Sequence, residues 1–448
     1  MLAWTRQALA VAREDWRRSP GVRHVLVVNV VSAFNAGLLI PILPLFLISK
    51  GFSLLQLGGI FVAVGVGALV VQLVAGRFPR AFGNPVLVMA LAFVPALTTP
   101  LYLLAQTPLQ FVGLAALGSF AGAASAPGVS ALIAQAAPVE GQARVFAYLG
   151  MLTGFAYAAA ILVAYSLASK GFGPVFALAT LVSLGVLGLT GWVLWRAHAA
   201  TPRSRAQRDA LTQDERQAFD DLAAARKGAL ASLHDLQRAR QGLVRRLPLG
   251  TGRNVALLST HLFLFGLSLA IYPIYFPIYL QQRGLPPAWI GPVIAASWIA
   301  AALFQLAGPT LAARTGRPRA VIVASLLACA ALNVVMGFAP LALIISAWVV
   351  FGVVDGVGRP LAMAMVAQNA SPAGPLASFS WTEAATSAAR ILAPYALALV
   401  VKRGGDLAMG FNYVALAVLA SALPFLFLAV PRRAPAAQPA TSPSGEPA

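Results

Sequence analysis

Twelve long apolar stretches limit what this chain can fold into. A helix needs about 20 apolar residues to cross about 30 Å of hydrocarbon. Backbone groups in lipid must pair internally, so spanning segments form helices or closed barrels, and the alternating pattern of barrel strands is absent here. We therefore expect an all-α membrane protein with twelve transmembrane helices. They are predicted approximately at 24–49, 54–76, 85–105, 108–136, 144–168, 172–195, 255–281, 288–311, 319–339, 341–368, 377–401 and 406–430.

The composition agrees with a membrane environment. Charged residues make up 10% of the 448 residues, against roughly 25% in soluble domains. The single cysteine, Cys329, cannot form an intrachain disulfide, and the four histidines show no metal-ligand spacing. We expect no metal and no other cofactor.

The basic residues behind the net charge of +19 are concentrated on alternate connections between the apolar stretches. Of the 32 Lys and Arg residues, 25 precede the first stretch, follow the last one, or lie on every second connection, and five lie on the other connections. The remaining two, Arg359 and Arg390, lie inside stretches. Since positive residues accumulate on the cytoplasmic side, we expect a multi-pass inner (plasma) membrane protein with both termini in the cytoplasm. This distribution does not favour nucleic-acid binding.

One long hydrophilic segment separates six stretches from six. Thr212 and Glu215 within it have the spacing of a helix capping box, so a helix is predicted there. This segment either contacts anionic lipid headgroups or is a solvated tether. The expected domains are a cytoplasmic amphipathic segment at 1–23, a six-helix bundle at 24–195, a cytoplasmic helical linker at 196–254, a second bundle at 255–430 and a disordered tail at 431–448.

The two halves repeat one another. Aligned at an offset of 233 residues, glycine, proline and glutamine positions coincide across most helices and five loops. Constant register over so many positions indicates duplication, and hence two pseudo-symmetric bundles. The matched pairs include Pro44 and Pro277, Gly51 and Gly284, Gln72 and Gln305, Gly83 and Gly316, and Phe146 and Phe379.

The doubled six-helix pattern, the long central loop and the loop after each half's second helix resemble the major facilitator superfamily. The family's signature loop is approximately G-x-L-x-D-R-x-G-R-K, and its acidic position holds Ala313 in one half and Arg80 in the other. The resemblance implies a gating role for this loop. The candidate gating residues are Gly76, Arg77, Arg80, Gly83, Gly308, Arg314, Gly316 and Arg317.

Residues 71–77 and 377–390 are similar to bacterial sugar efflux transporters. These resemblances imply a monomeric secondary active transporter that works by alternating access, with protons, a small solute and membrane lipids as its partners. We expect proton-coupled efflux, as an antiporter, of a sugar or drug-like compound. An importer or uniporter of the same fold is the alternative, and a receptor or channel is an alternative from another class. No enzyme is expected, because Walker A loops, nucleophile elbows and metal clusters do not occur.

Four charged residues lie within predicted spans, namely Asp355, Arg359, Glu383 and Arg390. An ionised group at this depth needs a partner or water, which makes each a functional candidate. Helix directions allow the cross-helix pairs Asp355 with Arg390 and Arg359 with Glu383, while Asp355 with Arg359 at i, i+4 competes. We expect either a carboxyl group that takes up a proton when its arginine moves away, or a permanent ion-pair lock.

Polar residues of two stretches, at 29, 32 and 35 and at 268, 272 and 275, recur at spacings of three or four and could line a central cavity. The family resemblance places helices 1, 4, 7 and 10 around that cavity, which adds Ser119 and Ser125, and Trp298 and Trp381 could stack on an apolar or sugar face. For any one residue, plain packing is the competing interpretation. The candidates are Asn29, Ser32, Asn35, Ser119, Ser125, Ser268, Tyr272, Tyr275, Trp298 and Trp381.

Overall fold

The protein was studied as a computed structural model that describes residues 20–77, 85–123, 126, 130, 141–199, 249–369, 375–403 and 405–428. Within these residues every predicted apolar stretch coincides with helix. Ten helical segments are long and apolar enough to cross a membrane, and two shorter apolar helices lie at Phe93–Leu104 and Pro108–Ala123. The all-α membrane fold predicted from the apolar stretches is confirmed.

The N-terminal half contains six of the predicted spans. The first is divided in two at 40–42, which contains Pro41, and Pro44 lies in the first turn of the helix that follows; proline lacks the donor that a continuing helix needs. The helices of this half are α2 (Pro20–Leu39), α3 (Leu43–Ser49), α4 (Leu54–Arg77), α6 (Pro85–Leu104), α7 (Pro108–Ala123), α9 (Gln142–Ala168) and α10 (Phe172–Ala199).

The C-terminal half contains the other six spans. Here α13 runs unbroken through Pro273 and Pro277, whereas the eighth and twelfth spans are each divided in two. Prolines start α14 and α16, a position where their missing donor is not needed. The helices are α13 (Leu249–Gln282), α14 (Pro287–Phe304), α15 (Ala307–Thr315), α16 (Pro318–Phe338), α17 (Leu341–Gln368), α18 (Pro375–Lys402), α19 (Leu407–Ala420) and α20 (Leu423–Phe427).

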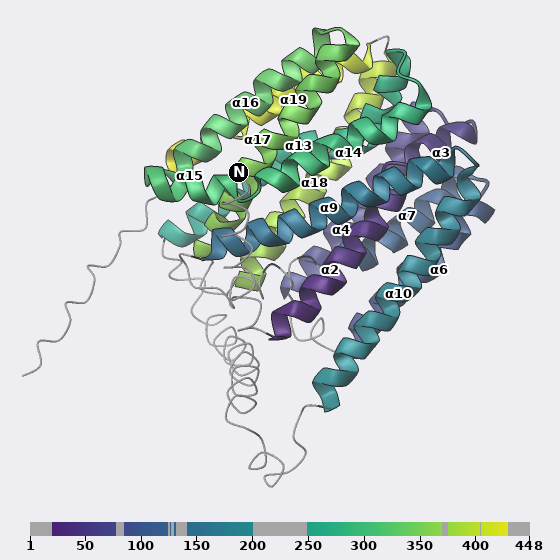
Figure 1. The fold of residues 1–448 in the computed structure, drawn as a ribbon, viewed down its shortest axis with the longest axis horizontal. Coiled ribbons are helices and arrows are strands. Elements are labelled where there is room, and N and C mark those ends of the chain that lie inside the picture. Colours follow the sequence, from purple (N-terminus) through teal and green to yellow (C-terminus); the bar gives the residue numbers. More distant parts are fainter. Residues whose placement is uncertain are drawn as a thin grey trace, which may run out of the picture.

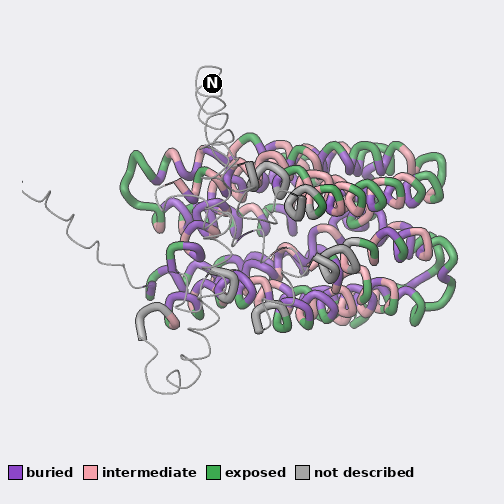
Figure 2. Tube along the Cα trace, turned by 90° about the horizontal axis from the view of Figure 1, so that it is seen from below, coloured by how far each residue is buried: buried purple, intermediate pink, exposed green. Residues whose placement is uncertain are grey.

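The helices form two bundles that lie side by side, the N-terminal one in purple to blue and the C-terminal one in green to yellow (Figure 1). Buried residues follow the faces where helices meet, and exposed residues cover much of the outside and the turns (Figure 2). Large apolar side chains such as Leu104, Leu109 and Phe338 are exposed. In a membrane these side chains face lipid, so their exposure is expected.

The repeat is visible in the local geometry of one end of the bundle. Gly51 and Gly284, matched at an offset of 233 residues, have φ values of 87° and 88°, which a side chain would disfavour. The residue before each glycine is basic and lies over an aromatic ring, Lys50 over Phe46 at 5.6 Å and Arg283 over Tyr279 at 5.0 Å. We call this end the glycine-turn end. The duplication predicted from the sequence thus extends to side-chain contacts.

The two halves contact each other through equivalent helix pairs, α4 with α18 and α14 with α9. The Gln72 amide lies 2.7 Å from the Ser387 hydroxyl of α18, and turned to satisfy its partners it also donates to the Glu383 backbone oxygen at 3.0 Å. Its repeat partner Gln305 packs against Gly150 of α9, where an added Cβ would lie 2.7 Å from the amide oxygen. The contact of the glutamine with the facing helix, at Glu383 in one case and at the matched Gly150 in the other, therefore occurs in both halves of the interface.

Contacts between the halves also occur toward both ends of the helices. At the end where α9 and α18 begin, which we call the linker end, Phe146 and Phe379 lie 5.9 Å apart. Toward the glycine-turn end, Gly58 of α4 packs against α18, and Gly291 of α14 packs against the ring of Tyr165. The described parts of the two halves thus contact each other both toward the linker end and toward the glycine-turn end.

Three segments with sequence-based predictions lie outside the described residues. These are the amphipathic segment at 1–19, most of the linker with its capping box at Thr212 and Glu215, and the tail from residue 429 onward. The proposed domain boundaries at these places stay predictions.

Candidate functional site

A cavity of about 500 Å³ lies in the middle of the bundle. Pockets that hold small organic ligands have volumes of about 300 to 1,000 Å³, so a small solute fits. Most of its wall comes from α13, α14, α16, α17 and α18 of the C-terminal half. The N-terminal half contributes Ile40, Pro41, Phe61, Val64 and Tyr157, of which only Tyr157 has a polar side chain.

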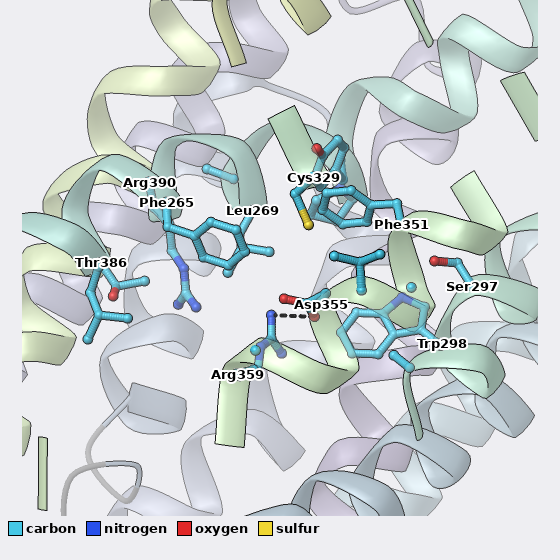
Figure 3. A pocket seen from close by; sticks show the side chains of 18 of the residues that line it. Phe265, Leu269, Ser297, Trp298, Cys329, Phe351, Asp355, Arg359, Thr386 and Arg390 are labelled. Carbon is cyan, nitrogen blue, oxygen red and sulfur yellow. Dashed lines mark ion pairs between the residues drawn. The ribbon is translucent and has the colours of Figure 1, made fainter. Parts of the chain in front are cut away.

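The cavity walls are mainly apolar and aromatic. The ring of Tyr157 lies 4.4 Å from the ring of Trp298, which places a pair of aromatic rings across the junction of the two halves. On the neighbouring helix α17, Trp348 and Phe351 are stacked, with 5.7 Å between centroids and 4° between planes. Phe265 also lines the cavity (Figure 3). Such surfaces bind flat or aliphatic groups.

All four predicted intramembrane charges line this one cavity. The Arg359 guanidinium lies 3.4 Å from the Asp355 carboxylate, and the two side chains are 33% and 10% exposed respectively (Figure 3). The structure therefore contains the i, i+4 pair. In the described residues neither cross-helix pair, Asp355 with Arg390 or Arg359 with Glu383, comes within ion-pair distance.

Glu383 and Arg390 lie on α18, where a spacing of seven residues brings them to the same face. Among the described residues neither side chain has a hydrogen bond or an ion pair within 4 Å. Glu383 interacts electrostatically with Arg390 and Arg359 over longer distances, and Arg390 interacts with the Tyr157 hydroxyl. The cavity thus contains one bound pair of charges and two charges without direct partners.

Several polar groups in the cavity wall already have partners. The Tyr272 hydroxyl donates to Asn333 at 2.6 Å, and the Ser325 and Thr386 hydroxyls donate to backbone oxygens of their own helices. Nδ1 of His261 lies 2.9 Å from the Ser421 backbone oxygen. These hydroxyls use their hydrogens within the wall, so towards a ligand they offer acceptor oxygens and no donor in this arrangement.

Of the polar and aromatic cavity candidates, Tyr272 and Trp298 line the cavity. Asn35 instead donates to Ser183 of α10 at 3.0 Å. Trp381 is 63% exposed and does not belong to the lining. Ser125 lies outside the described residues. The other candidates that do not belong to the lining are Asn29, Ser32, Ser119, Ser268 and Tyr275.

Three of these side chains have structural partners. The Ser119 and Ser268 hydroxyls bond to backbone oxygens within their own helices, at 3.0 and 2.6 Å. The Tyr275 hydroxyl donates to the Pro394 backbone oxygen at 2.7 Å and ties α13 to α18. Packing or hydrogen bonding between helices, the competing interpretation, accounts for them.

The candidate gating loop is described mainly in the C-terminal half. Gly308 is buried, and a Cβ there would overlap the Val357 backbone oxygen of α17. Gly316 ends α15 in a left-handed conformation with φ of 65°, and its neighbours Arg314 and Arg317 are exposed. In the N-terminal half, Gly76 and Arg77 belong to the last turn of α4, while Arg80 and Gly83 lie outside the described residues.

Sequence reasoning missed much of the cavity wall. The family resemblance places helices 1, 4, 7 and 10 around the cavity. In the structure none of the described residues of helix 4 belongs to the lining, whereas α4, α9, α14, α16 and α18 contribute. Two missed residues had a usable signal: Thr386 shares a helical face with Glu383 and Arg390, and Phe351 lies four residues before Asp355. Tyr157, from the other half, had none.

Comparisons with known proteins agree with this architecture. The sequence model of the Major Facilitator Superfamily matches residues 25–332. No curated protein matches the chain closely enough in sequence to count as a relative.

Solved structures share the fold at low sequence identity. The proton:xylose symporter XylE bound to 6-bromo-6-deoxy-D-glucose has a TM-score of 0.65 at 14% identity, with 92% of this chain and 97% of that chain covered. The nucleoside transporter NupG has a TM-score of 0.60 at 14% identity, with 91% and 98% covered. A mutant of NupG has a TM-score of 0.61 at 14% identity, with 91% and 99% covered. The chain belongs to the Major Facilitator Superfamily, whose members are membrane transporters.

Proposed function

We propose that this protein is a proton-coupled secondary active transporter of a small, largely apolar organic solute. One observation carries the proposal. A cavity of about 500 Å³ at the junction of two pseudo-symmetric bundles contains all four charged residues that the sequence places inside the membrane. A charge at this depth costs at least about 2.5 to 3.5 kcal/mol on insertion scales, so four of them in one cavity favour a function beyond packing.

The symmetry of the interface supports alternating access. The α4–α18 and α14–α9 contacts are equivalent in the repeat, and contacts occur toward both ends. Rocking of one bundle against the other breaks the contacts at one end and keeps those at the other, which exposes the cavity to one side at a time. The glutamine contacts at Gln72 and Gln305 lie on the linker side of the cavity and would be broken when that side opens.

Proton coupling is assigned to the carboxyl groups of Asp355 and Glu383. Asp355 is held by Arg359, and separating that pair changes the proton affinity of the carboxylate. Glu383 has no direct partner among the described residues, so its charge depends on what else occupies the cavity. A permanent lock between Asp355 and Arg359 is the structural alternative, and substitution distinguishes the two.

The wall favours a drug-like compound over a sugar. A sugar needs many hydrogen-bonding partners, but the Tyr272, Ser325 and Thr386 hydroxyls already use their hydrogens within the protein. Aromatic side chains form much of the remaining surface. Transfer of a solute with an apolar body from water to such a site costs little free energy.

Two directions of transport each have a supporting observation. Export is supported by the similarity of residues 71–77 and 377–390 to sugar efflux transporters. Proton-driven export requires that the solute and the proton do not occupy the cavity at the same time. Uptake of the solute together with a proton is favoured by Arg390. When Glu383 is protonated, the positive charge of Arg390 can be neutralised by a bound solute anion, so proton and anion would bind together. We place the protein in the inner membrane as a monomer with cytoplasmic termini, since the basic segments lie on one side.

The test is transport by the purified protein in proteoliposomes. Candidate solutes are first selected by thermal stabilisation of the protein from a panel of sugars, drugs and amino acids. Accumulation of a stabilising solute is then measured with an imposed pH gradient of either sign. Gradient-driven accumulation or depletion supports the proposal. Single-channel currents, or binding without movement of any stabilising solute, would contradict it.

A further inference from the structure

We infer that the solute is an organic anion with an aromatic or aliphatic body, and that Arg390 binds its acidic group. The inference deepens the proposed transport function and rests on it, but it does not depend on the direction of transport. It is argued from the charge balance of the cavity, from the side chains around Arg390 and from the charges at the glycine-turn end.

The charge balance is unequal because the two unpaired groups have different chemistry. Asp355 and Arg359 neutralise each other. The carboxyl group of Glu383 can lose its charge by binding a proton, whereas the guanidinium of Arg390 cannot be deprotonated in a protein. When Glu383 is protonated, the cavity therefore keeps one positive charge. An anionic group on the solute would balance this charge.

Arg390 is placed to reach a ligand. Its helix α18 lies against α4 at Gly65, where an added Cβ would lie 3.0 Å from the Arg390 backbone carbon, so the backbone is fixed at the junction of the halves. The side chain is exposed and extends beside Phe265 into the cavity (Figure 3). In the described part of the chain no carboxylate lies within ion-pair distance of it. A planar guanidinium in this position can bind a carboxylate through two parallel hydrogen bonds.

The groups around Arg390 fit the rest of such a solute. Tyr157, the polar side chain that the N-terminal half contributes to the lining, shares the cavity with Arg390. The ring of Phe265 lies beside Arg390 (Figure 3), and the paired rings of Tyr157 and Trp298 supply further flat apolar surface in the same cavity. A volume of about 500 Å³ accommodates an arene or short alkyl chain with its acid group.

The charges at the glycine-turn end point to the same class of solute. The described turns at this end carry a single carboxylate, Asp406, and that group caps α19. A basic rim raises the local concentration of anions and speeds their entry. The basic residues there are Lys50, Lys170, Arg283, Lys402 and Arg403.

The experiment compares ligands that differ only in charge. The purified protein is titrated with benzoate, 4-phenylbutyrate and 1-naphthoate, each paired with its neutral amide and its amine. Binding is followed by protection of Cys329, the single cysteine, from N-ethylmaleimide, because its thiol lines the same cavity. We expect at least one carboxylate to protect at a concentration tenfold or more below that of its amide, with no protection by the amines.

Two variants and a control assign the effect to Arg390. Arg390→Gln is expected to abolish the tenfold preference for the carboxylate, and Arg390→Lys is expected to restore part of it by returning the charge. Arg253→Gln, which removes an exposed arginine of α13 that does not line the cavity, should leave the preference unchanged. Protection of Cys329 by the neutral amide should persist in Arg390→Gln, which shows that this variant is folded.

The outcomes separate this inference from the transport function. Equal or stronger protection by amides or amines, no protection by any carboxylate, or a preference that survives Arg390→Gln overturns the inference. Transport of neutral or cationic solutes in that case leaves the proposed function intact. Binding of carboxylates at Arg390 without movement of any of them across proteoliposomes supports the inference and contradicts the function.

Discussion

Phe146 and Phe379 occupy equivalent positions in the two repeats and contact each other, with ring centroids 5.9 Å apart. Two residues that a pseudo-two-fold rotation exchanges can touch only where they lie beside the axis itself. The axis that relates the halves therefore passes the linker end between these rings. The cavity and its charges, by contrast, lie mostly in one half, so the function has departed from the symmetry of the fold.

Removing either cavity carboxyl group is expected to uncouple transport from protons. In Asp355→Asn or Glu383→Gln, at least one variant should lose tenfold or more of gradient-driven accumulation while keeping solute exchange between the two sides, because exchange needs no proton release. Proteoliposome flux with and without a pH gradient measures both quantities. If both variants retain full gradient-driven transport, the carboxyl groups only hold helices together.

Removing the symmetric glutamine contacts is expected to favour opening at the linker end. Gln72→Ala deletes the hydrogen bonds to α18, and Gln305→Ala deletes the equivalent contact with Gly150. Maleimide labelling of Cys329 from that side should become severalfold faster in each variant and faster still in the double variant. Gln56→Ala changes an exposed glutamine of the same helix α4 and is the control. Unchanged labelling in the double variant would show that these contacts do not hold the end closed.

A methyl group at Gly308 is expected to destabilise the C-terminal bundle. The added Cβ would overlap the Val357 backbone oxygen, so α15 and α17 would have to separate. Forcing extra volume into packed structure costs about 1 to 3 kcal/mol, and the thermal midpoint in detergent should fall. Gly185→Ala has open space around its Cβ and should be neutral or slightly stabilising. Equal midpoints for the two variants would disprove this account of the helix contact.

The fold could be predicted because each helix had its own signal in the sequence. The length of the apolar stretches predicts the spans. Matched positions such as Gly51 and Gly284 indicate the repeat from the sequence alone, and both have the same left-handed backbone conformation in the structure. The sugar efflux type is not confirmed by the comparisons, which establish the superfamily alone. Such short segments are shared by many helices built from the same small and apolar residues.

The site was predicted only in part. The four charges were found because charge is rare in lipid, and the Asp355–Arg359 pair was one of the alternatives that helix spacing allowed. Asn35 and Trp381 could not be placed, because which side of an almost uniformly apolar helix faces inward is set by its neighbours. Tyr157 enters the cavity only through packing of α9 on α14, a contact between halves that no local pattern records.

Alternating access, the central claim, is tested most directly through Cys329, the chain's only cysteine, which is 1% exposed and lines the cavity. A membrane-impermeant maleimide is applied to vesicles of either orientation, with Cys329→Ser as the unlabelled control. The account predicts labelling from both sides, and conditions or ligands that increase it from one side should decrease it from the other. Labelling from a single side under every condition, or parallel increases on both sides, would contradict it.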